Sequence, residues 1–177
     1  VSAVTGEGIP QLLAAIESIA QQVQERSAEG YARLPIDRAF TITGFCTVVT
    51  GTLWSGKINS GDTLELMPSG LQVKVRNLHV HNEKVKTAYA GQRVAVNLQG
   101  IELAEVSRGD LLATPGILAP SYRIDARLKL IKSSKRSLSN WNRVRFHLGT
   151  DETMGRVVLL DRDQLNPGEE ALVQLVM

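Results

Sequence analysis

The sequence predicts a mainly β protein: two consecutive antiparallel β-barrels, the second incomplete, preceded by one amphipathic α-helix. From residue 35 onward, short runs rich in Val, Ile, Leu and Thr are mostly bounded by Gly, Pro or Asn, a pattern typical of strands joined by turns. Helical spacing of apolar residues occurs only over residues 9–23. In residues 44–62, β-branched residues lie between glycines, as expected where a small barrel bends sharply.

The composition is that of an ordinary globular protein, with 43% apolar and 21% charged residues among 177. This length allows one or two domains with modest cores. The net charge of +2 is too small for general coating of nucleic acid, so any RNA contact must depend on local patches. The single Cys46 excludes an internal disulfide framework and fits a reducing, cytoplasmic compartment. No apolar run is long enough to span a membrane.

Residues 9–23 are predicted to form the helix, with Pro10 in its first turn. A lone amphipathic helix has no core of its own, so we expect it to pack either on the barrel or on a part of the protein outside this sequence. The polar residues 21–30 are predicted to end the helix and form a linker. Because the sequence opens with Val1 rather than an initiator Met, we expect a fragment.

The first β region is predicted to contain strands at residues 36–43, 47–53, 63–67, 71–81, 93–98 and 110–113. The two halves of 71–81 place apolar residues at opposite parity, which predicts a β-bulge near Arg76 and Asn77. The residues 44–62 are interpreted as two strands joined by a tight connection, with a turn at 59–62.

The second β region opens after Pro120, with strands predicted at residues 124–130, 144–148, 156–160 and 171–176. Four strands make a poor closed barrel, and the sequence ends within an apolar run, so we expect an incomplete unit. Its unpaired edges should be covered by a neighbouring molecule or by the helix.

No catalytic site is predicted for this chain. The histidines, the single cysteine and the scattered carboxylates show no triad or dyad spacing, and no Gly-rich phosphate-binding loop occurs. His79 and His81 are predicted to share one face of a strand, but without a third ligand nearby they favour exposed histidines over a metal site. Cys46 is interpreted as a small residue that fills a barrel corner rather than a nucleophile.

Charged residues beside the predicted strands allow two interpretations. Asp37, Arg38 and Arg93 either form a solvated barrel rim or line a pocket for a small ligand that carries an anionic and a cationic group. A second group of basic residues fits either solvated loops or phosphate contacts; its members are Lys132, Lys135, Arg136, Arg143 and Arg145.

Residues 44–52 resemble the Gly-x-Gly-Thr-Val-Val-Thr-Gly signature in the second domain of translational GTPases, and residues 90–98 and 106–112 extend the match. The chain is most similar to the bacterial selenocysteine-specific elongation factors (the SelB family), and less so to general elongation factor Tu, in four further segments: residues 34–40, 53–56, 79–82 and 155–161. The barrel signature alone also fits elongation factor Tu or an initiation factor, which is the alternative interpretation.

This resemblance implies that residues 1–30 end a GTPase domain, that 31–117 form domain II, and that 118–177 form a truncated domain III. Ser2 and Ala3 would belong to the loop that contacts guanine. The whole factor would deliver selenocysteyl-tRNA to the ribosome. A domain upstream of this chain would bind GTP and Mg²⁺, and a domain downstream of it would bind an mRNA hairpin. This chain alone would catalyse nothing.

The resemblance further implies that domain II binds the aminoacylated 3′ end of the tRNA, with Asp37, Arg38 and Arg93 recognising selenocysteine. A selenol is more acidic than a thiol and largely anionic at neutral pH, so both arginines would stabilise it. Asp37 would accept a hydrogen bond from the amino group or orient an arginine. A serine would leave the charged groups unpaired. Cys46 replaces the second glycine of the signature and would be strained if that position required a positive φ.

Overall fold

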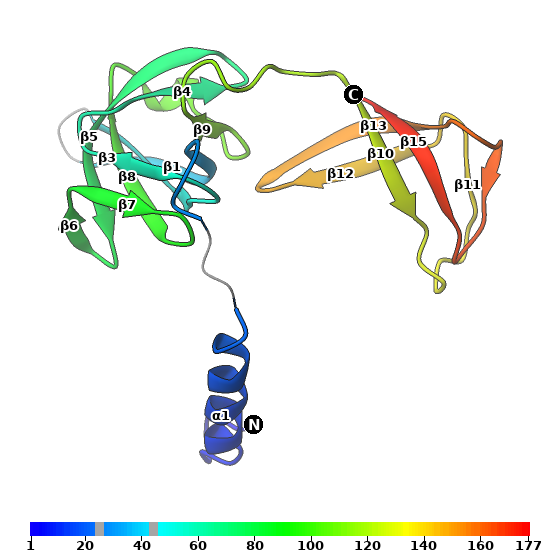
Figure 1. Cartoon of the computed structure of the whole chain (residues 1–177), viewed down its shortest axis with the longest axis horizontal. Coiled ribbons are helices and arrows are strands. Elements are labelled where there is room, and N and C mark those ends of the chain that lie inside the picture. The colour runs from blue at the N-terminus through cyan, green and yellow to red at the C-terminus, as the bar shows by residue number, and fades with distance from the viewer. Residues whose placement is uncertain (24–26, 43–45) are drawn as a thin grey trace.

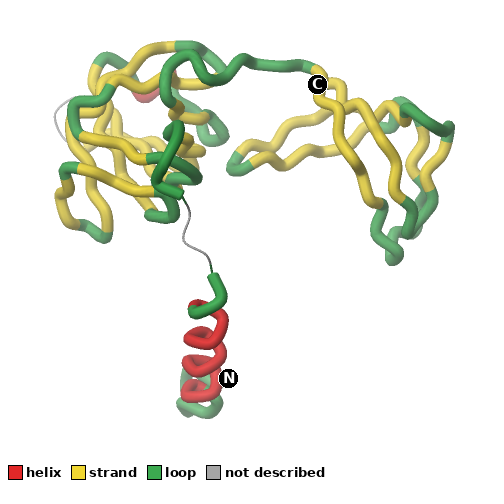
Figure 2. Tube along the Cα trace, viewed as in Figure 1, coloured by secondary structure: helices red, strands yellow, loops and turns green. Residues whose placement is uncertain are grey.

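A computed structural model describes residues 1–23, 27–42 and 46–177, with one helix and two groups of strands (Figure 1). Helix α1 (Ile9–Ala20) stands apart from both groups (Figures 1 and 2). It ends at Ala20 rather than residue 23, because polar residues follow. None of its residues is buried. The expectation that it packs on the barrel is therefore wrong, and packing on a part of the protein outside this sequence stays a prediction.

The first group of strands forms a closed antiparallel barrel. Its strand order is β4-β9-β1-β2-β8-β5, and pairing of β4 with β5 closes the ring, while β6 extends β5 and β3 pairs with β7. The elements are β1 (Arg33–Ile42), β2 (Cys46–Thr52), β3 (Lys57–Asn59), β4 (Thr63–Met67), β5 (Leu71–Val80), β6 (Glu83–Val85), β7 (Thr87–Tyr89), β8 (Arg93–Gln99), the 3₁₀ turn η1 (Leu103–Glu105) and β9 (Leu111–Ala113).

The barrel interior is filled by apolar side chains from every strand of the ring. Val94, Val96 and Leu98 of β8 are at most 1% exposed, so the predicted shared face is the inner one. The register between β5 and β8 shifts between Val75 and Asn77, which confirms the predicted bulge. Strands β6 and β7 were not predicted, because three residues are too short to show an alternating pattern.

The prediction for residues 44–62 is wrong in its pairing. Strand β2 pairs with β1 and β8, whereas β3 pairs with β7, so the two segments do not pair with each other. The predicted turn at 59–62 is present, with Asp62 Oδ2 accepting a hydrogen bond from the backbone of Asn59. Cys46 begins β2 without a positive φ, so the expected strain is absent. Residues 44 and 45 of the signature, and residue 43 at the end of the predicted strand 36–43, lie outside the described residues.

The second group of strands forms an open sheet of order β10-β15-β13-β12, with β11 and β14 paired separately. Strands β10 and β12 are its edges, and α1 covers neither of them (Figure 1). Covering by the helix is therefore wrong, and covering by a neighbouring molecule stays a prediction. The strands are β10 (Arg123–Lys129), β11 (Leu138–Ser139), β12 (Arg143–Leu148), β13 (Asp151–Leu159), β14 (Gln164–Leu165) and β15 (Glu170–Val176). No helix among the described residues is long and apolar enough to cross a membrane.

Candidate functional site

Asp37 is the extra residue of a β-bulge in β1. Ile36 lies opposite Gly51 and Arg38 lies opposite Thr50, so Asp37 between them has no counterpart on β2. Ile36 is fully buried, and after the bulge it is Ala39 that packs against the core. A regular strand would point one of two consecutive residues inward, whereas the bulge keeps both Asp37 and Arg38 out of the barrel core.

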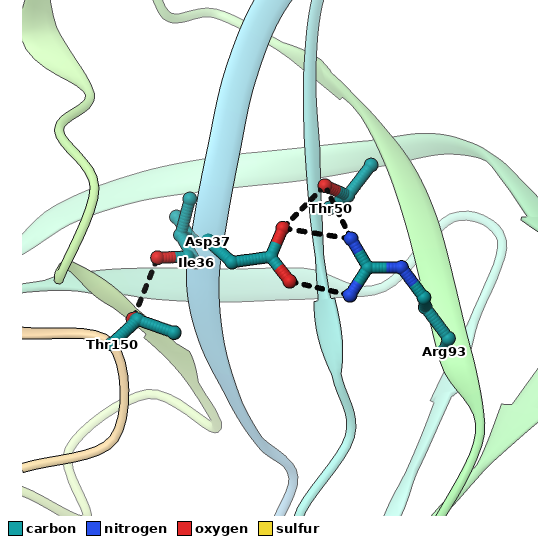
Figure 3. A network of polar contacts seen from close by, with 5 residues as sticks. All are labelled: Ile36, Asp37, Thr50, Arg93 and Thr150. Atoms are coloured by element: carbon teal, nitrogen blue, oxygen red, sulfur yellow. Dashed lines mark hydrogen bonds and ion pairs between the residues drawn. The ribbon is translucent and has the colours of Figure 1, made fainter.

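The Asp37 carboxylate forms a two-point ion pair with Arg93 of β8 (Figure 3). Arg93 Nη1 donates to Oδ2 at 2.5 Å and Nη2 donates to Oδ1 at 3.0 Å. Between them, Thr50 of β2 donates its hydroxyl to Asp37 Oδ1 at 2.7 Å. Three adjacent strands thus supply one network, in the fork geometry that arginine and carboxylate favour.

The electrostatics of the network favour the charged form of both partners. Partial burial is the largest single influence on the pKa of Asp37 and raises it, but hydrogen bonds from Arg93 and Thr50 and the positive charges of Arg93 and Arg38 together lower that pKa below its ordinary value. The hydrogen bond to Asp37 raises the pKa of Arg93. The Arg93 side chain remains 54% exposed, so solvent screens the pair and its role in stability is small.

Arg38 lies next to this pair without bonding to it. Its side chain is exposed, and among the described residues it forms no ion pair. Since Asp37 neutralises Arg93, the three side chains carry a net charge of +1, and this charge belongs in effect to Arg38. The structure therefore brings all three predicted residues to one outer face of the barrel. Two of them are bonded to each other, and the third, Arg38, has no partner within the described ranges.

A row of less polar residues adjoins the charged group and was not predicted. Phe40 lies opposite Val48, and Val48 lies opposite Asn97, across β1, β2 and β8. On the same face, this row is two residues along each strand from the Arg38 and Thr50 row, or about 7 Å. Asn97 Oδ1 is buried and lacks a hydrogen-bond partner within the described parts of the chain. The sequence offered only one signal, a polar residue in the alternating β8 pattern.

The remaining predicted residues lie elsewhere. Ser2 and Ala3 belong to the turn before α1, where the Ser2 hydroxyl accepts a hydrogen bond from the Thr5 N–H. His81 follows the end of β5 with a φ of 52°, so its predicted place on the same strand face as His79 is wrong. Within the described ranges, no group of three or more His, Cys, Asp or Glu residues could hold a metal ion. Cys46 Sγ accepts a hydrogen bond from Arg76.

The basic residues of the second unit are dispersed. Arg145 is paired with Glu152 at 2.9 Å, whereas Lys132, Lys135 and Arg136 are exposed in the segment between β10 and β11. Arg143 lies directly opposite Arg156 on the neighbouring strand. These positions remain compatible with both interpretations of the basic residues.

A family model and several known elongation factors match this chain. Residues 47–113 match the family model for elongation factor Tu domain 2. Over 99% of its length the chain is 42% identical to the selenocysteine-specific elongation factor of Desulfomicrobium baculatum, covering 28% of that protein. It is 30% identical to elongation factor Tu 2 of Streptomyces avermitilis over 92% of its length, covering 44% of that protein.

A solved structure is similar over nearly the whole chain. The apo form of translation elongation factor SelB from Methanococcus maripaludis superposes with a TM-score of 0.85 and 28% identity, covering 99% of this chain and 42% of that one. The same factor in complex with the GTP analogue GppNHp gives a TM-score of 0.78 at 26% identity, with the same coverage. The chain therefore spans less than half the length of each of these proteins.

Proposed function

Because this chain belongs to the selenocysteine-specific elongation factors, translational GTPases of the SelB type, we propose that its barrel of residues 31–117 binds the aminoacylated 3′ end of selenocysteyl-tRNA. The observation that carries the proposal is the Asp37–Arg93 pair with Arg38 beside it. Elongation factor Tu is the alternative, and the higher identity to the selenocysteine-specific factor, 42% against 30%, disfavours it.

The bonding pattern divides the roles of the two arginines. Both terminal nitrogens of Arg93 donate to Asp37, so this guanidinium is oriented but largely neutralised. Arg38 keeps its charge and its donors and is the better primary contact for a selenolate. Of the two roles predicted for Asp37, the geometry favours orienting an arginine, although a carboxylate has acceptor sites left for the amino group.

Discrimination against seryl-tRNA follows from the same charges. A neutral serine hydroxyl at this site would partly desolvate Arg38 without offering it an anion. Losing a charge-assisted hydrogen bond costs about 1.5–3 kcal/mol of binding free energy. Because Arg38 is exposed to solvent, we expect a cost near the lower value. We therefore expect Arg38 to contribute about tenfold to the preference for selenocysteine.

The adjoining row of Phe40, Val48 and Asn97 suits the terminal nucleotide. Phe40 is 38% exposed and offers an aromatic surface for a base or a ribose. Asn97 Oδ1 is a buried acceptor that a donor on the nucleotide would satisfy. Because every tRNA ends in the same nucleotides, this row would contribute affinity without selecting the amino acid.

The wider proposal covers the whole factor. Residues 1–30 would end a GTPase domain, with Ser2 and Ala3 near guanine, and residues 118–177 would belong to domain III. GTP and Mg²⁺ would bind upstream and an mRNA hairpin downstream, with the ribosome in the cytoplasm as the final partner. Catalysis would be confined to the GTPase domain, so this chain would not be an enzyme by itself.

The proposal is tested by replacing Arg38 and Arg93 singly with Ala in the full-length factor. Dissociation constants for selenocysteyl-tRNA and seryl-tRNA are measured for each variant. We expect the preference for selenocysteyl-tRNA over seryl-tRNA to fall in both variants, so that the ratio of the two constants approaches one. For Arg38→Ala we expect this preference to fall about tenfold. Lys74→Ala, which removes an exposed charge from β5, is the control. An unchanged ratio in both arginine variants would show that the site assignment is wrong.

A further inference from the structure

The turn between β12 and β13 reaches the first barrel at the Asp37 bulge. Thr150 donates its hydroxyl to the carbonyl oxygen of Ile36 at 2.7 Å (Figure 3). Gly149 has a φ of +64°, and a Cβ there would lie 2.9 Å from the ring of Trp54. Asp151 lies against Gly109, whose N–H donates to the same Ile36 carbonyl at 3.0 Å. Three consecutive residues of the second unit thus contact the first.

The carbonyl that Thr150 contacts belongs to the peptide that leads into Asp37. At a bulge the ladder with the neighbouring strand is interrupted, so β2 does not fully determine the orientation of this peptide. The Ile36 oxygen instead accepts two hydrogen bonds, from Gly109 and from Thr150, which occupy both of its lone pairs. The orientation of the bulge is therefore set partly from the second unit.

We propose that Thr150 is a positioning residue that holds the Ile36–Asp37 peptide so that the Asp37 carboxylate meets Arg93 at two points. Hydrogen bonds of this kind extend from about 2.7 to 3.2 Å, so a displacement of about 1 Å breaks one of them. The bond to the Ile36 carbonyl lies on the side of β1 away from Arg93, as Figure 3 shows. Thr150 thus restrains Asp37 without approaching the ligand surface.

Positioning and simple adhesion between the two units make different predictions. If Thr150 only joins the units, losing its hydroxyl leaves the Asp37–Arg93 pair intact. If it positions the bulge, the pair weakens and the pKa of Asp37 moves up toward its ordinary value, because that pKa is held down by Arg93 and Thr50. Arg38 and Arg93 are the charged groups that act on Asp37, and neither is altered by a change at Thr150.

The experiment is an NMR titration of the Asp37 carboxyl carbon in this chain. Thr150→Val removes the hydroxyl while keeping the shape, and we expect the titration midpoint to rise toward the ordinary value. Thr150→Ser keeps the hydroxyl and should retain the wild-type midpoint. Asp151→Asn, a change in the same turn that leaves Thr150 in place, should not raise it. A wild-type midpoint in Thr150→Val, with that protein folded, would overturn the proposal.

Folding of each variant is judged from the amide signals of Val49 and Val96 in the barrel core, which should not move. If Thr150→Val does not fold, Gly149→Ala provides the second variant, because its Cβ would push the turn from Trp54 and withdraw the hydroxyl. An unchanged Asp37 midpoint in Gly149→Ala would overturn the proposal equally.

The consequence for ligand selection rests on the function proposed above. In the full-length factor we expect Thr150→Val to lower the preference for selenocysteyl-tRNA over seryl-tRNA several-fold, in the same direction as Arg93→Ala. If the Asp37 midpoint moves and the preference does not, the positioning role stands and the ligand role of Asp37 fails. If the midpoint stays, positioning by Thr150 fails whatever the preference.

Discussion

Replacing Gly51 by Ala should destabilise the first barrel strongly. Gly51 lies opposite Ile36 beside the bulge, where β1 and β2 approach very closely. A Cβ at this position would lie 2.0 Å from the carbonyl oxygen of Pro35 and 2.8 Å from Cδ2 of Leu34. Both atoms belong to buried residues, so neither can turn away into solvent.

The magnitude follows from the separation that the new methyl group requires. An ordinary contact starts at 3.4 Å, so the strands must part by about 1.4 Å, which stretches the neighbouring ladder hydrogen bonds beyond their normal range. Overpacking of a core costs about 1–3 kcal/mol, and each lost ladder bond about 1 kcal/mol. We therefore expect a loss of about 3–5 kcal/mol in the free energy of unfolding.

Denaturant unfolding followed by tryptophan fluorescence measures this loss. Trp54 lies in the first unit and Trp141 in the second, so a Trp141→Phe background lets Trp54 report on the barrel alone. The midpoint should fall with little change in slope. Thr52→Ala, one position along the same strand, is the control and should change stability by less than about 1 kcal/mol. An equally small effect of Gly51→Ala would refute the reasoning from the close approach.

Two further predictions concern Asn97 and Asp110. Asn97→Leu should raise the dissociation constants for selenocysteyl-tRNA and seryl-tRNA equally, by about fivefold for one lost hydrogen bond. The free chain should stay at least as stable, because a buried unpaired oxygen is removed. Filter binding measures the first effect and denaturation the second, and a changed ratio between the two tRNAs would contradict a role shared by both. Burial raises the pKa of Asp110, and the charge of Asp151 adds to this. The folded pKa therefore exceeds the unfolded one, so the stabilisation by protonated Asp110 is complete below its ordinary pKa and is lost as the pH rises through the folded value. Asp110→Asn should accordingly be more stable than wild type at pH 7 and lose that advantage below about pH 4, where an aspartate of ordinary pKa becomes protonated. Thermal unfolding at both pH values checks this, and an advantage that is larger in acid would contradict it.

Alternation of apolar and polar residues predicted the longer strands well. The strands β4, β5 and β8 lie within a residue or so of the predicted ranges, because each buries one face against a single core. The bulge in β5 was predicted because large apolar residues change parity there. Strands of two or three residues, such as β11 and β14, were missed because alternation needs a longer run to be visible.

The bulge in β1 was missed although it has the same kind of signal. Ile36 and Ala39 both face the core, but Ala39 is small, and the exposed Phe40 and Ile42 continue the parity of Ile36. The larger residues thus indicated the wrong face after position 37. The contact between Thr150 and Ile36 spans 114 positions and depends on tertiary structure alone, so no local pattern could have predicted it. The three charged site residues were singled out by their place beside the predicted strands, and the resemblance then supplied their selenocysteine-binding role.

The geometry of the site implies that its two arginines are not interchangeable. Asp37 is bonded to Arg93 at two points and to Thr50 at a third, so Arg93 acts largely through Asp37. Replacing Arg93 leaves the Asp37 carboxylate without its partner. This carboxylate then attracts Arg38 and competes with an anionic ligand for it. Replacing Arg38 removes the free cation but leaves the pair intact. The two substitutions therefore weaken selenolate binding by different routes, and because residues that share a partner are not independent, their combined effect should differ from the sum of the single effects.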